Sequence, residues 1–136
     1  MNLDEVIQAL RELNEPVPQP LRLPTPKKID EVEERLGYQF HPDFRTYLRQ
    51  ASDVVYGTLE PVTVTPDSGH TDLRRVAPRA WDMGVPRSLL PVCEDNADYF
   101  CMNGRGEIVY WSHNGLTDEK WPDLATWIKE VWIDEG

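Results

Sequence analysis

Residues 96–115 read NADYFCMNGRGEIVYWSHNG and carry the clearest fold signal in this chain. Two runs rich in large apolar residues, 97–103 and 107–113, meet at the segment NGRG. Asparagine and glycine tolerate the positive φ angles of tight turns, so the pattern predicts a β-hairpin. A phosphate-binding loop would need a third glycine or a Lys-Ser/Thr pair, followed by a helix, and the segment has none of these. The stretch therefore predicts two antiparallel strands and no nucleotide site.

A cysteine and a histidine in the same stretch raise the question of nucleophilic chemistry. Cys101 would need His113 or His70 beside it and a third orienting group. It lies between large apolar residues, however, and fits a small core residue better. The histidines, with His41 as the third, are far apart and show no metal-ligand spacing. We therefore predict no catalytic residue, no metal and no cofactor, and we expect Cys101 and Cys93 to be free thiols.

Apolar residues at helical spacing predict helices on both sides of the hairpin. The first covers 3–13, and the connector that follows, 15–26, contains five prolines that favour extended backbone. Thr25 and Pro26 form a helix start, because a hydroxyl cap precedes a proline at the first helical position. Gly37 supplies the stop for that helix. Further helices are expected to begin at Pro42, Leu73 and Pro122.

Strand signals gather in the middle and C-terminal half of the chain. Besides the hairpin, a strand is expected over 57–65, interrupted or edged by Pro61, and another over 89–95. Pro78 should break or kink the helix that begins at Leu73. Because strands and helices do not alternate regularly, we predict an α+β fold with a mainly antiparallel sheet packed by helices. A length of 136 residues suits one domain over 1–136.

Composition and charge limit the partners that this chain can bind. The formal net charge is −10, which repels nucleic-acid phosphates and anionic membranes and favours encounter with basic proteins. No run approaches the roughly 18 apolar residues that span a bilayer. The N-terminal residues lack the basic and apolar regions of a secretory signal. We therefore expect a cytoplasmic protein that binds neither nucleic acid nor membrane.

The order of these segments resembles the SUKH superfamily, the Smi/Knr type. The opening pattern of that superfamily resembles IDEVEERLGYQFHPDFRTYL (29–48). The matching positions would be Ile29, Glu33, Leu36, Gly37, Phe40, Phe44 and Leu48. The stretch LLPVCEDNADYFCMNGRGEIVYWSHNG resembles its central block, and DLATWIKEV resembles its closing helix. The resemblance covers about 25–133 and leaves residues 1–24 outside. His41 departs from the pattern, since the family usually has proline there.

This resemblance implies an α+β fold and a binding function without catalysis. Bacterial members are largely immunity proteins that neutralise toxins, many of them nucleases, and fungal members regulate cell-wall synthesis. Together with the charge, it predicts that this chain binds a basic cognate toxin through acidic loops on either side of the hairpin. Tyr99 and Trp111 are expected in the core because they lie inside strands. The expected contact residues are Asp67, Asp72, Glu94, Asp95, Asp98, Asp118 and Glu119.

Two other functions stay open at this point. A regulatory or scaffold module would bind another protein without any toxin. A small hydrolase would use paired carboxylates, such as Asp95 and Asp98, as acid and base.

Overall fold

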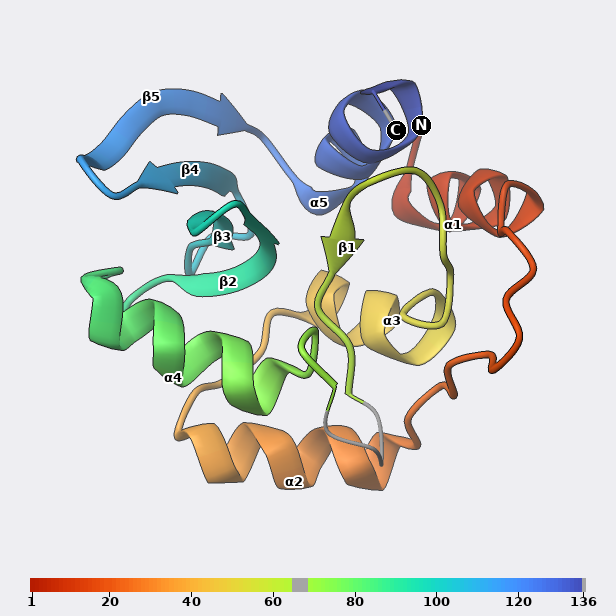
Figure 1. The fold of residues 1–136 in the computed structure, drawn as a ribbon, viewed down its shortest axis with the longest axis horizontal. Coiled ribbons are helices and arrows are strands. Elements are labelled where there is room, and N and C mark those ends of the chain that lie inside the picture. Colours follow the sequence, from red (N-terminus) through yellow and green to blue (C-terminus); the bar gives the residue numbers. More distant parts are fainter. Residues whose placement is uncertain (65–68, 136) are drawn as a thin grey trace.

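The computed structural model describes residues 1–64 and 69–135. Within these ranges a sheet in the order β1-β2-β3-β4-β5, with every neighbouring pair antiparallel, is packed by helices (Figure 1). The α+β prediction is therefore confirmed. The strands are β1 (Glu60–Pro61), β2 (Leu90–Asp95), β3 (Asp98–Met102), β4 (Ile108–Ser112) and β5 (Gly115–Trp121).

The described helices begin and end where local chemistry places their caps. Asn2 and Glu5 form a reciprocal capping box at the first helix, and the Thr25 hydroxyl accepts from the Lys28 amide at the second. Gly37, with φ +64°, ends that second helix in the left-handed conformation that glycine adopts without strain. The helices are α1 (Leu3–Glu12), α2 (Pro26–Leu36), α3 (Pro42–Gln50), α4 (Leu73–Met83) and α5 (Leu124–Trp127), which continues as the π-helical segment η1 (Ile128–Ile133).

The predicted hairpin is confirmed as the pair β3 and β4. Tyr99 pairs with Trp111, and Cys101 pairs with Val109. The turn is closed by the side chain of Asn103, whose Oδ1 accepts from two backbone amides of the turn, those of Arg105 and Glu107. This is an asparagine-centred turn and not an anion-binding loop.

The two faces of the sheet pack against different helices. On one face the Tyr99 hydroxyl reaches Sδ of Met83 at the end of α4, at 3.6 Å. On the other face the Phe100 ring lies 5.3 Å from the ring of Trp127 in α5. Cys101 is fully buried, which confirms its place in the core. The central strands β2 and β3 each carry a run of four consecutive buried residues because both of their faces are covered.

α1 forms part of the main core. Its residues Val6, Ile7 and Leu10 are buried and belong to the same hydrophobic cluster as the sheet and the C-terminal helix. α1 contacts α3, α5 and η1, and in Figure 1 it lies beside the blue C-terminal helix. None of the described helices is long and apolar enough to cross a bilayer.

Two predicted elements differ from the structure. The strand expected over 57–65 is reduced to Glu60–Pro61, followed by an isolated parallel bridge between Thr63 and Asp72. The expected disruption at Pro78 does not end α4, which runs unbroken through it. Pro78 is exposed, so its ring lies on the solvent side of a helix whose other side is fixed by buried apolar residues.

The end of the chain also differs from the prediction. Residues 115–121, expected as a loop, form the edge strand β5, so Asp118 and Glu119 lie on a strand. The C-terminal helix begins at Leu124, capped by Asp123, and widens into the π-helical segment at Ile128. Both differences bear on the candidate site, because β5 and η1 are the elements that border it.

Candidate protein-binding cleft

A cleft of about 400 Å³ lies between strands β2 to β5 and the C-terminal helix. Its apolar wall is formed by Phe100, Tyr110, Trp121 and Val131. Its rim carries four carboxylates, those of Asp95, Glu119, Glu130 and Glu135. No lysine, arginine or histidine of the described residues lines it. We refer to these eight residues as the acidic cleft.

Aromatic packing fixes the apolar wall of the acidic cleft. The Phe100 ring lies 4.7 Å from Tyr110 and 5.6 Å from Trp121, centroid to centroid. Phe100 is buried, whereas Tyr110 and Trp121 are half-buried and keep part of their surface open. The buried ring thus holds the two partly exposed rings in place, which gives the cleft preformed aromatic walls.

The Tyr110 hydroxyl joins two of the predicted carboxylates. It donates to Oδ2 of Asp95 at 3.1 Å and to Oδ2 of Asp98 at 3.2 Å. Burial and the two neighbouring carboxylates raise the pKa of Tyr110 well above its usual value, so it stays a neutral donor. Asp95 and Asp98 flank a two-residue turn in which Asn96 and Ala97 have φ of 51° and 71°.

Asp98 is also held by the start of the loop after β4. Its Oδ1 accepts from the backbone amide of His113 at 3.1 Å and lies 3.3 Å from Nδ1 of the same residue. Burial by itself would raise the pKa of Asp98, but the hydrogen bonds from His113 and Tyr110 outweigh it and lower the pKa below its usual value. Asp98 therefore carries its charge at neutral pH.

A bulge in the edge strand places Glu119 on the cleft. Val109 pairs with Lys120 and Trp111 pairs with Leu116, so residues 117–119 lie opposite Tyr110 alone. Thr117 anchors the bulge by donating from its hydroxyl to the Tyr110 carbonyl at 2.9 Å. Extra residues on one strand bend it and redirect its side chains. The sequence pattern indicated the acidic residues here but not the strand that carries them.

The π-helical segment η1 brings Glu130 and Glu135 to the same cleft. In an α-helix, residues five apart point about 140° away from each other. In a π-helix the hydrogen bonds run from i to i+5, so residues five apart lie on the same face. The Asp134 amide, which donates to the Lys129 carbonyl, has this i+5 spacing. The sequence pattern did not indicate either glutamate, because an ordinary helical spacing of 3.6 residues per turn would separate them.

The remaining predicted contact residues lie elsewhere. Asp118 is exposed on the β5 bulge next to Glu119. Glu94 is exposed on β2 and lines a small hollow with Glu60 and His70, away from the cleft. Asp72 is fully buried, where it caps α4 through the Arg74 amide and pairs with the Arg74 guanidinium at 2.6 Å. Asp67 lies outside the described residues.

The groups considered for catalysis show other chemistry. The lowered pKa of Asp98 is opposite to what a general acid needs. Burial raises the pKa of Cys93 and of Cys101 to about 12, so both thiols are protonated and poor nucleophiles at neutral pH. Both cysteines are free, in agreement with the prediction.

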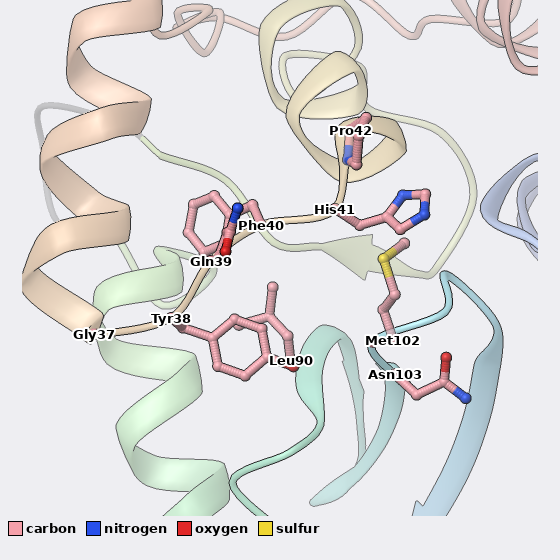
Figure 2. Close-up of a pocket in the computed structure, with 10 residues that line it drawn as sticks. Gly37, Tyr38, Gln39, Phe40, His41, Pro42, Leu90, Met102 and Asn103 are labelled. Carbon is pink, nitrogen blue, oxygen red and sulfur yellow. The ribbon is translucent and has the colours of Figure 1, made fainter.

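A second hollow, of about 440 Å³, lies between the α2–α3 connection and the hairpin. Figure 2 shows the side chains of His41, Leu90 and Met102 around it. Two of its polar side chains are used by the fold: His41 Nδ1 accepts from the Asp43 amide and caps α3, and Asn103 closes the hairpin turn. It holds none of the predicted contact residues, so the acidic cleft is the stronger candidate.

The fold is that of a small α+β module, and the acidic cleft is its candidate site. A family model described as SMI1-KNR4 cell-wall, of the SUKH group, matches residues 3–133, and the chain belongs to this family. The match includes α1 and the proline-rich connector, which the residue pattern had left outside. Members of this family are generally non-enzymatic immunity or regulatory proteins that act through protein interactions.

A solved structure gives a second comparison. A crystal structure of a protein from Pseudomonas syringae pv. tomato is 46% identical to this chain, with a TM-score of 0.93. The alignment covers 96% of this chain and 98% of that one. No curated protein matches this chain significantly.

Proposed function

We propose that this chain is an immunity-type protein of the cytoplasm that binds a basic cognate toxin one to one and neutralises it. The observation that carries the proposal is the acidic cleft, in which four carboxylates surround aromatic walls without a basic side chain among the described lining residues. The net charge of −10 supports the same kind of partner. A nuclease must present a basic surface to phosphate, so an acidic inhibitor can occupy that surface in its place.

The surface that we propose for contact is centred on the acidic cleft. Asp95 and Glu119 line it, Asp98 supports Asp95 through Tyr110, and Asp118 lies beside Glu119 on the bulge. Among residues 1–64 and 69–135, no side chain forms a hydrogen bond or an ion pair with the carboxylate of Glu119 or of Glu130; the Thr117 hydroxyl accepts only from the backbone amide of Glu119. A partner can therefore pair with these two carboxylates without breaking a hydrogen bond or an ion pair inside this chain. Long-range attraction from this face would speed encounter with a basic protein.

The direct test is neutralisation and binding of a toxin by designed variants. A pull-down from the source organism, and the gene next to this one, provide the candidate toxin. Cells that express the toxin should survive when this chain is co-expressed. Glu119→Gln/Glu130→Gln should weaken the complex by roughly tenfold or more, as expected when charge pairs at an interface are broken.

Glu12→Gln/Glu34→Gln is the matched control. Both residues are exposed on α1 and α2, and the change in net charge is the same. This control should bind within about twofold of wild type, because it changes only the long-range field. If neither cell survival nor a complex is observed with the recovered toxin, the proposal is wrong. An association rate that does not fall in about 0.5 M salt would exclude electrostatic steering.

A regulatory or scaffold function is the second candidate, and the description of the matched family, which names the cell wall, favours it. Such a module would bind a non-toxic protein through the same cleft. Recovery of a non-toxic partner that binds wild type and loses affinity for Glu119→Gln/Glu130→Gln, with no rescue of toxin-expressing cells, would support this candidate over immunity.

A further inference from the structure

We propose that the acidic cleft is a socket for one arginine side chain of the partner protein. This inference rests on the proposed function, since it names the group that the basic partner inserts. The cleft differs from an acidic patch on a convex surface, because it is a hollow of about 400 Å³ with aromatic walls. A volume of this size falls within the range of small-ligand pockets, about 300–1,000 Å³.

The aromatic walls favour a flat cation. Tyr110 and Trp121 are half-buried and are supported from behind by the buried ring of Phe100. A guanidinium stacks on such faces through cation–π attraction and is more weakly hydrated than an ammonium, so it loses less on entering a partly dry site. The same chain shows this contact on its own surface, where the Arg87 guanidinium lies 4.4 Å from the ring centroid of Trp81.

The arrangement of the carboxylates favours a cation that carries several separate hydrogen-bond donors. Asp95 comes from the end of β2, Glu119 from the bulge of β5, and Glu130 and Glu135 from the last helix. In the described part of the chain no three acidic or metal-binding side chains gather closely enough to hold a metal ion. Carboxylates spread around a hollow match the five donors of a guanidinium, whereas a lysine ammonium is a compact point charge.

Such a socket would concentrate binding energy in one residue of the partner. Interface hot spots are enriched in arginine and lie in desolvated pockets bordered by contacts that exclude water. Val131 and Phe100 supply apolar borders of this kind at the cleft. One arginine that protrudes from the basic surface of the partner would then fix the position of the complex, and the rest of the acidic surface would steer the approach.

The test uses the isolated protein and small probes, so it does not need the toxin. The ¹⁵N-labelled protein is titrated with three probes: N-acetyl-arginine amide, N-acetyl-lysine amide and the neutral analogue N-acetyl-citrulline amide. The indole signal of Trp121 is followed by NMR, and the variant Trp121→Phe assigns that signal. We expect saturable shifts with the arginine probe at a dissociation constant on the order of 1–10 mM. The lysine probe should bind several-fold more weakly, and citrulline should give no saturable shift.

Variants connect the response to the cleft. Glu119→Gln/Glu130→Gln should lower affinity for the arginine probe at least fivefold, and Glu12→Gln/Glu34→Gln should leave it unchanged. All four residues are exposed, so these variants are expected to fold. The proposal is overturned if the arginine probe gives no saturable shift, if citrulline or lysine matches it, or if both variants lose affinity equally.

Failure of the socket and failure of the proposed function have different signatures. If Glu119→Gln/Glu130→Gln binds and neutralises a toxin as well as wild type does, the proposed function stands and the arginine socket is overturned. Binding of the arginine probe together with absence of any toxin partner would overturn the immunity function and retain the socket.

Discussion

Replacing Gly106 by alanine should destabilise the hairpin for two separable reasons. Gly106 has φ +83°, a backbone conformation that costs an L-residue about 1–2 kcal/mol. A Cβ at this position would also lie 2.7 Å from Nε2 of His41. The ring must therefore move, and it can swing into the neighbouring hollow shown in Figure 2.

The cost of that movement is set by the bond that the ring gives up. His41 Nδ1 accepts from the Asp43 amide at 3.1 Å and caps α3, and loss of a helix cap costs about 1 kcal/mol. Gly106→Ala should therefore lower the free energy of unfolding by about 2–3 kcal/mol in total. In a His41→Ala background the cap is already lost, so the same substitution should cost only about 1–2 kcal/mol.

Urea unfolding followed by circular dichroism measures all four proteins of this double-mutant cycle. Gly104→Ala is the matched control in the same turn, because a Cβ there meets nothing within 4 Å and its φ is not positive. This control should change stability by no more than about 0.5 kcal/mol. Equal costs of Gly106→Ala in both backgrounds, or a cost no larger than that of Gly104→Ala, would refute the predicted clash with His41.

Three further predictions follow from the β2–β3 turn and the core. Ala97 has φ 71° in a turn that favours Asn-Gly, so Ala97→Gly should stabilise the protein by about 0.5–1 kcal/mol in urea unfolding, and destabilisation would contradict this. The pKa of Asp98 is lower in the folded than in the unfolded state, so its stabilisation is present above the unfolded pKa and is lost as pH falls through the folded value. Stability measured from pH 7 to pH 3 should therefore fall less in Asp98→Asn than in wild type, and parallel curves would disprove the role of His113 and Tyr110. Buried thiols with a pKa of about 12 should resist a thiol reagent at pH 8 until urea is added, and rapid labelling of native Cys93 or Cys101 would argue against their burial.

The parts of the fold that were predictable depend on local chemistry. Thr25 caps α2 and Gly37 ends it, because a hydroxyl acceptor and a residue free of Cβ strain act within one turn of the chain. NGRG predicted the hairpin turn for the same reason. His41, the departure from the family pattern, takes the cap position of α3, and Pro42 takes the first helical position.

The parts that were not predictable depend on distant contacts. β5 contains GLTDEKW, which lacks apolar alternation, and it forms a strand because the edge of β4 offers hydrogen-bonding partners. Asp72 looked like a loop carboxylate, but the fold buries it against Arg74. The acidic cleft itself joins β2, β5 and η1, and only the assembled sheet and helix bring these together.

The π-helical segment has a consequence for how this helix can change among relatives. The loss of one residue between Glu130 and Glu135 would leave these two glutamates four residues apart in a helix of ordinary pitch, and an α-helix places residues four apart on one face. Glu135 would therefore stay beside Glu130, and Ile128, which precedes the change, would stay buried. A single-codon deletion can thus remove the π-helical turn in one step while the charge pattern of the cleft is kept.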